Sequence, residues 1–253
     1  MSNEQIYLFL DVDGVIIRGE GVDPSIRRPW DNTLQTQFSI DPQKLSALFF
    51  IEHFTNLLKG QGDLKTILGD VLSRLGYAGS VDDIIQCWFS SDANLDFELL
   101  EGVNNLKQTV GVKAFLATNQ EKYRAEYIWE ELGLIGYFDG IFCSASIGAM
   151  KTDIAFYEHI HSALGISPEA TTILFFDDSE KNIVAARNVG WKAYHYKSIA
   201  DFKENTLVQK LVGESTIKIV DGQKSITNSY GLAGLGSDGC GPDFLLGASE
   251  RSI

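Results

Sequence analysis

Three short apolar runs, each followed at once by polar residues, constrain the fold of this 253-residue chain more than any other feature. A run of about five β-prone apolar residues that stops at a polar turn is typical of a buried strand. The runs and the residues that end them are 6–10 before Asp11-Val12-Asp13-Gly14, 113–117 before Thr118-Asn119, and 172–176 before Asp177-Asp178. We therefore predict three buried strands that end in carboxyl, hydroxyl and amide groups.

Strand and helix patterns alternate from about residue 105 to residue 200. Helical spacing occurs over residues 122–132, 154–163 and 181–189, and weaker strand patterns occur over residues 140–143 and 193–196. This alternation predicts an α/β fold, in which a Rossmann-like parallel sheet has helices on both faces. Ligands of such sheets bind beyond the carboxyl ends of the strands. The three polar clusters would meet there.

The segment after Gly14 has helical spacing instead, over residues 42–58, 64–75 and 81–89. Asp41 and Pro42 suit the N-cap and the first position of a helix, and residues 60–62 (Gly-Gln-Gly) suit a break between two helices. We predict an α-helical lobe inserted after the first strand.

The predicted domain organisation follows from these patterns. Residues 1–14 and 101–212 form the α/β core, and residues 15–100 form the helical insert. Residues 213–253 form a Gly-rich C-terminal extension of unknown role, for which we expect a peripheral hairpin around Asp221-Gly222.

The charge balance excludes some classes of partner. Thirty-four acidic residues against 21 basic ones give a formal net charge of −13, which opposes binding to nucleic acid or to an anionic membrane surface. No stretch has the pattern of a membrane span, and residues 1–10 lack that of a secretory signal. Cys87, Cys143 and Cys240 are odd in number and scattered, so we expect reduced thiols in a cytoplasmic protein.

The carboxylates at the predicted strand ends suit a metal ion and a phosphoryl group. Asp11 and Asp13 alternate along an extended chain, and Gly14 lets the backbone approach a ligand between them. Asp177 and Asp178 can complete the shell of oxygen ligands that Mg²⁺ prefers. Each pair also has a purely structural interpretation, a surface turn for the first and a helix cap for the second.

Two further positions offer partners for phosphoryl oxygens. Thr118 carries a hydroxyl, and the loop that begins at Asn119 offers backbone amides at a strand-to-helix junction. The ammonium of Lys151 can neutralise both a phosphate and the crowded carboxylates. A helix cap and a solvated surface lysine are the structural alternatives. An anionic substrate needs such local positive charge in a chain this acidic.

The order and spacing of these signals make the chain resemble the haloacid dehalogenase-like (HAD-like) superfamily of phosphohydrolases. The motifs are Asp-x-Asp-Gly-Val at 11–15, Thr-Asn at 118–119, Lys at 151 and Asp-Asp-Ser at 177–179. The resemblance covers about residues 5–200, and residues 175–191 are especially like its sugar-phosphatase-type members. The helical insert after the first motif is similar to the family's α-helical cap. One departure is Thr152, where many relatives have proline.

The resemblance implies a role for each residue. Asp11 attacks phosphorus to give an aspartyl phosphate, and Asp13 acts as the general acid and then as the base. The implied ligands of Mg²⁺ are Asp11, the Asp13 carbonyl, Asp178 and, directly or through water, Asp177. The implied phosphate-binding groups are Thr118, the Asn119 amide and Lys151.

We therefore predict a Mg²⁺-dependent phosphomonoesterase that acts on a small phosphorylated metabolite, for example a sugar phosphate. The alternatives are a phosphoglucomutase-like mutase, a haloacid dehalogenase and a catalytically silent binding or scaffold protein. A dehalogenase needs no proton donor, so Asp13 favours phosphate. The candidates for recognition of the leaving group are Arg18, Arg27, Arg28, Trp30 and His53, with packing for Trp30 and surface positions for the arginines as the structural alternatives.

Overall fold

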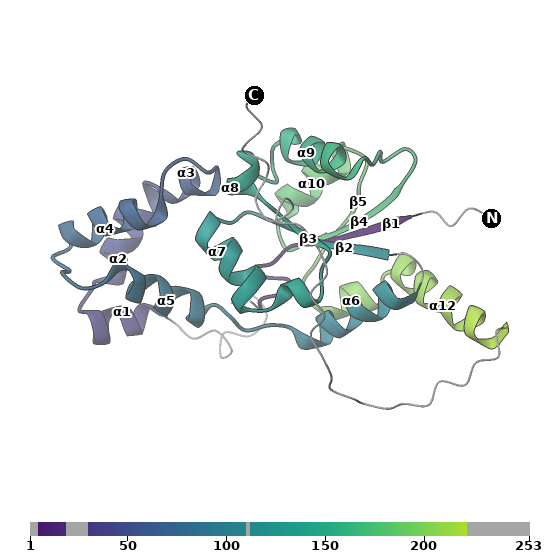
Figure 1. Ribbon diagram of the computed structural model, residues 1–253, viewed down its shortest axis with the longest axis horizontal. Helices are drawn as coiled ribbons and strands as arrows, with labels where there is room; N and C mark the ends of the chain where they lie inside the picture. The colour runs from purple at the N-terminus through teal and green to yellow at the C-terminus, as the bar shows by residue number, and fades with distance from the viewer. Residues whose placement is uncertain (1–4, 19–29, 110–111, 222–253) are drawn as a thin grey trace, which may run out of the picture.

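Five parallel strands form one sheet in the order β3-β2-β1-β4-β5 (Figure 1). The computed structural model describes residues 5–18, 30–109 and 112–221. The strands are β1 (Ile6–Leu10), β2 (Val112–Thr118), β3 (Gly140–Cys143), β4 (Thr172–Asp177) and β5 (Lys192–His195). Their ends lie within one residue of the predicted ends, so the prediction of a parallel α/β sheet is confirmed. The first strand lies in the middle, hydrogen-bonded to β2 and β4.

Helices cover both faces of this sheet because successive side chains of each strand point to opposite faces. Leu8 and Leu10 face one core, and Tyr7 and Phe9 face the other. The first core is closed by residues of α6 (Phe97–Thr109), α7 (Lys122–Glu126), the π-helical turn η2 (Tyr127–Glu131), α11 (Ile199–Lys203) and α12 (Thr206–Asp221). The second is closed by α9 (Ile154–Leu164) and α10 (Glu180–Asn188). Two short elements, η3 (Leu134–Gly136) and α8 (Ser144–Ile147), flank β3.

The segment after residue 212 differs from the prediction. The chain is helical from Thr206 to Asp221 in α12. The first strand of the predicted hairpin would fall on these helical residues, so that part of the prediction is wrong. The reason is packing, because Val208 and Leu211 of this helix are buried against the first core. Gly222 and the Gly-rich residues that follow lie outside the described residues.

The inserted segment folds as a helical lobe beside the sheet, at the left of Figure 1. Its elements are α1 (Trp30–Phe38), α2 (Pro42–Leu45), the π-helical turn η1 (Ser46–Ile51), α3 (Phe54–Leu58), α4 (Leu64–Arg74) and α5 (Val81–Ser91). It has its own apolar core, which includes Leu34, Leu68 and Trp88. Its entry and exit run side by side, since Arg18 N donates to Asn94 O at 2.9 Å and Asp96 N donates to Ile16 O at 2.7 Å.

The local signals in the lobe have mixed outcomes. The Asp41 side chain caps α2 by accepting from Gln43 N at 2.9 Å, as predicted. The segment 42–58 is helical, as predicted, but a π-helical turn and a break at Glu52-His53 divide it. The π-helical turn points Phe49 inward and leaves Ile51 outside. Positive φ angles at Gly60 and Gly62 make the predicted break before α4.

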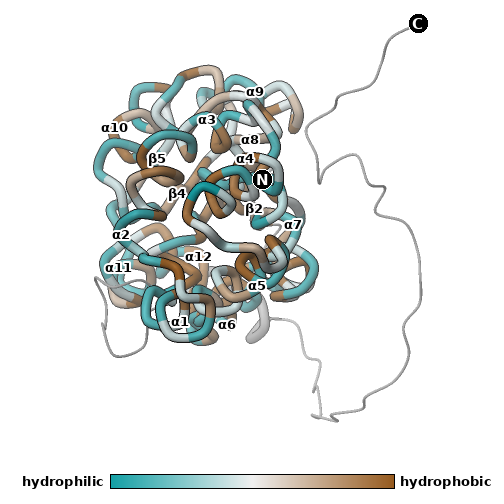
Figure 2. Tube along the Cα trace, turned by 90° about the vertical axis from the view of Figure 1, so that its left-hand side faces the viewer, coloured by the Kyte–Doolittle hydropathy of each residue, from teal (hydrophilic) through white to brown (hydrophobic). Residues whose placement is uncertain are grey.

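Brown and teal alternate along the helices in Figure 2, as expected for helices with one buried face. Within the described residues, no helix has the length and apolar character needed to cross a bilayer. Cys87 and Cys143 are free thiols, and Cys240 lies outside the described residues.

Candidate active site

The carboxyl ends of β1, β2 and β4 bring the predicted polar residues to one edge of the sheet. Leu10, Leu116 and Phe176 lie side by side in register, so the residues that follow them leave the sheet together. Asp11 is tied to this edge by its backbone N–H, which donates to Phe176 O at 2.9 Å. Asp177 ends β4.

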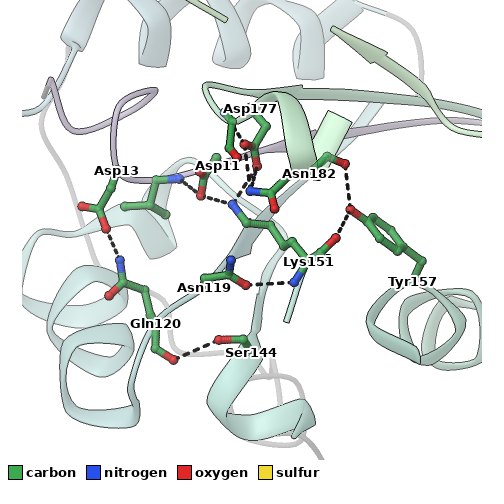
Figure 3. A network of polar contacts seen from close by, with 11 residues as sticks. Asp11, Asp13, Asn119, Gln120, Ser144, Lys151, Tyr157, Asp177 and Asn182 are labelled. Atoms are coloured by element: carbon green, nitrogen blue, oxygen red, sulfur yellow. Dashed lines mark hydrogen bonds and ion pairs between the residues drawn. The ribbon is translucent and has the colours of Figure 1, made fainter. Parts of the chain in front are cut away.

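The centre of the site is an ammonium between two carboxylates (Figure 3). Lys151 Nζ lies 2.5 Å from Asp11 Oδ1 and 2.7 Å from Asp177 Oδ2. All three side chains are buried, and that of Lys151 is only 1% exposed. A buried charge is tolerated only when it is paired and hydrogen-bonded. The surface interpretation of Lys151 is therefore wrong.

Neighbouring polar groups hold this centre in place. Asn119 Oδ1 accepts from Lys151 N at 2.9 Å, and the Tyr157 hydroxyl donates to Lys151 O at 2.7 Å. Asp177 Oδ1 accepts from Asn182 Nδ2 at 3.0 Å and from Ser179 N at 2.8 Å. The lysine is thus fixed through its backbone, and its ammonium has little freedom to leave the carboxylates.

The electrostatics of the site reflect burial and crowding. Burial raises the pKa of Asp11 well above its usual range, and the neighbouring carboxylate of Asp177 adds to the rise, whereas Lys151 opposes it. Burial by itself lowers the pKa of Lys151, but its two carboxylate partners outweigh this effect and raise the pKa overall. The lysine is therefore an ammonium at neutral pH, and one ammonium faces several carboxylates.

The carboxylates suit a divalent cation. Oxygens of Asp11, Asp177 and Asp178 lie within 4.8 Å of one another, a group found by a search of the described residues. Burial and the charge of Asp177 raise the pKa of Asp178. A cation with a preference for hard oxygen ligands would relieve this crowding. The position of the Asp178 side chain also requires glycine at residue 14, because a Cβ there would lie 2.2 Å from Asp178 Oδ2.

Asp13 lies apart from this centre, with its side chain directed toward Gln120 (Figure 3). Its side chain is 51% exposed, and it accepts from Arg124 Nη2 at 2.9 Å and from Gln120 Nε2. Arg124 is buried and also donates from Nη2 to Asp92 O at 3.2 Å. Asp13 is therefore held near solvent, at the side of the site that faces the lobe.

The helix that carries Arg124 begins at an unusual cap. Glu121 is buried, and its carboxylate accepts from the backbone N–H groups of Tyr123 and Arg124. Burial raises the pKa of Glu121 to about 7. The helix that orients Arg124 toward Asp13 thus depends on a carboxyl group with a shifted pKa.

A cleft of about 700 Å³ extends from Asp13 to the lobe. From the core and the first residues of the insert it is lined by Asp13, Gly14, Ile17, Arg18, Asn119, Gln120 and Arg124. From the lobe and its connection it is lined by Trp30, Asp31, Pro42, Gln43, Ser46, Ala47, Phe50, Ile51, Phe54, Trp88 and Asp92. A cleft of this size holds a ligand larger than a phosphate ion.

The positions of the other sequence candidates vary. Thr118 is buried at the end of β2, one residue before Asn119. Arg18 and Trp30 line the cleft, but Arg18 Nη2 is paired with Asp96 Oδ1 at 3.2 Å and Trp30 stacks on Trp88. His53 is absent from the cleft lining that the structure describes. Arg27 and Arg28 lie outside the described residues.

Sequence reasoning missed four groups that shape the site: Gln120, Arg124, Tyr157 and Asn182. Gln120 directly follows Thr118-Asn119, so its position in the loop after the strand could have identified it as a candidate site residue. Asn182 lies one turn into the helix after Asp177-Asp178 and could have been found in the same way. Tyr157 gave no signal, because its contact with Lys151 depends on the packing of α9.

Comparison with known proteins agrees with this geometry. A sequence model of the haloacid dehalogenase-like hydrolases matches residues 7–190. The chain is 27% identical over 174 residues to a sesquiterpene phosphatase of Aspergillus oryzae, covering 66% of this chain and 82% of that one. It is 28% identical over 124 residues to a flavin mononucleotide hydrolase of Arabidopsis thaliana, covering 46% of this chain and 50% of that one. It therefore spans half the length of the flavin mononucleotide hydrolase.

Among solved structures, a HAD family enzyme of Bacteroides thetaiotaomicron in complex with magnesium and inorganic phosphate is similar in fold. Its TM-score is 0.61 at 18% identity, and the match covers 76% of this chain and 93% of that one. At this identity the likeness concerns the fold alone.

The shifted pKa of Glu121 makes stability depend on pH. In the folded protein this carboxyl keeps its proton up to about pH 7, but in the unfolded chain it releases the proton near about pH 4.3. The protonated Glu121 carboxyl therefore makes its full contribution to the stability of the folded protein below about pH 4.3, and this contribution is lost as the pH rises to about 7. Glu121→Gln should gain free energy of unfolding relative to the unsubstituted protein across this window, by up to about 3 kcal/mol.

Urea unfolding at pH 4, 6 and 7.5, chosen to bracket that window, measures this effect. Glu126→Gln, which neutralises an exposed carboxylate on the same helix, is the matched control. Parallel stability curves for Glu121→Gln and the unsubstituted protein would show that Glu121 has no shifted titration.

Proposed function

The chain belongs to the haloacid dehalogenase-like hydrolases, and we propose that it is a Mg²⁺-dependent phosphomonoesterase acting on a small phosphorylated metabolite through an aspartyl phosphate. The observation that carries this proposal is the buried centre of Asp11, Lys151 and Asp177. It lies beside a cleft that is lined by Asp13. The similarity to two enzymes named as a phosphatase and a mononucleotide hydrolase supports hydrolysis of a phosphate ester.

In the proposed reaction, a carboxylate oxygen of Asp11 bonds to phosphorus as the ester bond to the leaving oxygen breaks. Asp13 gives its proton to that oxygen. Asp13 then removes a proton from water, which attacks the aspartyl phosphate, releases inorganic phosphate and restores Asp11. Asp13 is half exposed and lines the cleft, which suits a group that must exchange protons with a leaving group and with water.

This reaction needs positive charge to neutralise the phosphoryl oxygens, because the chain itself has a net charge of −13. Lys151 supplies part of it, and with Thr118 and the Asn119 amide it would bind the phosphoryl oxygens. Mg²⁺, held by Asp11, the Asp13 carbonyl, Asp178 and, directly or through water, Asp177, would neutralise phosphoryl charge when bound. The crowding of carboxylates around one ammonium supports this assignment.

Other assignments follow from the same proposal. The helical segment 15–100 serves as the cap over the core formed by residues 1–14 and 101–212. The proton donor at Asp13 favours the phosphatase over a dehalogenase. The acidic composition and the free thiols of Cys87 and Cys143 support a cytoplasmic protein with no nucleic-acid partner.

Asp11→Asn should abolish phosphate release, by about 10³-fold or more, because the amide cannot attack phosphorus. Release is measured from an aryl phosphate and a panel of sugar and nucleotide phosphates, with Mg²⁺ or with EDTA. Asp70→Asn, an exposed aspartate in the lobe, is the control and should keep full activity. Undiminished release by Asp11→Asn, or equal release in EDTA, would contradict the proposal.

Asp13→Asn should impair alkyl phosphates far more than aryl phosphates. An alkyl leaving group needs the proton that Asp13 supplies, a contribution of about 10² to 10⁴ in rate, whereas an aryl oxide leaves without it. Values of kcat/KM for phenyl and p-nitrophenyl phosphate against ethyl phosphate measure the difference. Equal losses on both classes would remove Asp13 as the acid.

A further inference from the structure

The cleft beside Asp13 has a polar end and an apolar end. At the core, its lining includes the side chains of Asp13, Asn119, Gln120 and Arg124. At the lobe, most of its lining is apolar, from Trp30, Pro42, Ala47, Phe50, Ile51, Phe54 and Trp88. Among the described lining residues between 30 and 92, the side chains with polar groups other than indole are Asp31, Gln43, Ser46 and Asp92, and none is a lysine, arginine or histidine.

The apolar end is a connected aromatic surface. Phe50 and Phe54 lie with ring centroids 5.2 Å apart, and Trp88 lies 5.2 Å from the first and 5.6 Å from the second. These rings come from the π-helical turn η1, from α3 and from α5, three separate elements of the lobe. π-helical turns occur often at functional sites. Rings that support one another in this way present a firm face to a ligand.

Ile51, at the end of the same π-helical turn, is 77% exposed and lines the cleft. An exposed isoleucine alone needs no explanation. Next to a continuous aromatic surface it extends an apolar patch, and such patches mark binding sites. An apolar ligand in the cleft would remove this side chain from water.

The polar end carries a buried donor without a partner. The Arg124 side chain is only 3% exposed, and its Nη2 is used by Asp13 and by Asp92 O. Its Nη1 is buried and has no hydrogen-bond partner among the described residues. A buried donor left unpaired is costly. Arg124 lines the cleft beside Asp13, so the polar end carries a cationic donor.

We propose that the substrate is a phosphate monoester with an apolar leaving group, an aliphatic or aromatic alcohol that lies along Phe50, Ile51, Phe54 and Trp88. This inference rests on the proposed phosphatase function. The ester oxygen lies at Asp13, where the proton is supplied, and the apolar chain extends toward the lobe. The ligand has one anionic end and one apolar end, which match the polar end and the apolar end of the cleft.

A sugar phosphate, the example that the sequence suggested, fits this lining less well. Each sugar hydroxyl buried against Phe50, Phe54 or Trp88 would lose its hydrogen bonds to water without a replacement. An alkyl chain gains free energy at the same place by leaving water. The lobe therefore selects for apolar and against polyhydroxylated leaving groups.

A series of n-alkyl phosphates from ethyl to decyl, used below their micelle concentrations with Mg²⁺, tests the proposal. We expect kcat/KM to rise about fourfold per methylene until the cleft is filled, and hexyl phosphate to exceed glucose 6-phosphate. Ile51→Asn should lower kcat/KM for octyl phosphate about tenfold more than it lowers kcat/KM for ethyl phosphate. Because Ile51 is exposed, this variant should fold normally.

Ile135→Asn is the matched control, since Ile135 is 55% exposed and lies outside the lining of this cleft. It should behave as the unsubstituted protein with every ester. A flat dependence on chain length, a preference for glucose 6-phosphate, or an Ile51→Asn variant identical to the control would each overturn the inference.

Calorimetric binding of octylphosphonate, which has no ester bond to hydrolyse, separates this inference from the proposed reaction. Apolar burial predicts tighter binding than for ethylphosphonate and a negative change in heat capacity, both reduced in Ile51→Asn. If no ester releases phosphate, the phosphatase proposal fails, and chain-length-dependent phosphonate binding would still support an apolar ligand. Equal binding of ethyl- and octylphosphonate would overturn the apolar ligand whatever the activity.

Discussion

The ammonium of Lys151, buried between the carboxylates of Asp11 and Asp177, is the interaction on which the candidate site depends. Removal of one partner from such a buried pair leaves a charge without compensation and typically costs about 3 to 5 kcal/mol. The surrounding structure therefore supports the group at every side, through Asn119 and Tyr157 at the lysine backbone and Asn182 at the carboxylate. Such support keeps reactive groups in a fixed geometry before a substrate arrives.

The parallel sheet explains how so much charge is brought together. The central strand β1 and its neighbours β2 and β4 end at one edge, and the segments that connect the strands bring Lys151 and Arg124 to the same edge. The chain is acidic as a whole, yet Lys151 and Arg124 supply positive charge at the edge where a phosphate would bind. The lobe then adds an apolar wall on the open side, so that one cleft combines anion recognition with apolar burial.

Local patterns in the sequence predict the sheet well. The runs that became β1, β2 and β4 are apolar on both faces, and the polar residues after them mark the strand ends, so Asp11, Thr118 and Asp177 were placed at the correct edge. The caps at Asp41 and the glycines before α4 are local signals too. Long-range packing accounts for the failures. The π-helical turn η1 and the helical course of α12 are set by buried contacts that no local pattern contains.

The cleft shows the same limit, since its lining comes from residues as far apart in sequence as Asp13, Trp88 and Arg124. Arg124 could be placed on a helix from the sequence, but its contact with Asp13 depends on how that helix docks on the sheet. The positions of the residues that we propose as catalytic are therefore largely predictable from strand ends, whereas the surface that we propose to contact the leaving group is not.

The central claim is that Asp11 becomes phosphorylated during turnover. Rapid acid quenching of the Asp13→Asn variant with p-nitrophenyl phosphate, followed by borohydride reduction, proteolysis and mass spectrometry, tests it directly. Water activation is slowed in this variant, so the acyl phosphate should accumulate and be reduced to homoserine at position 11 alone. Phosphate release from p-nitrophenyl phosphate without any modification of Asp11, or with modification of another residue, would contradict the account.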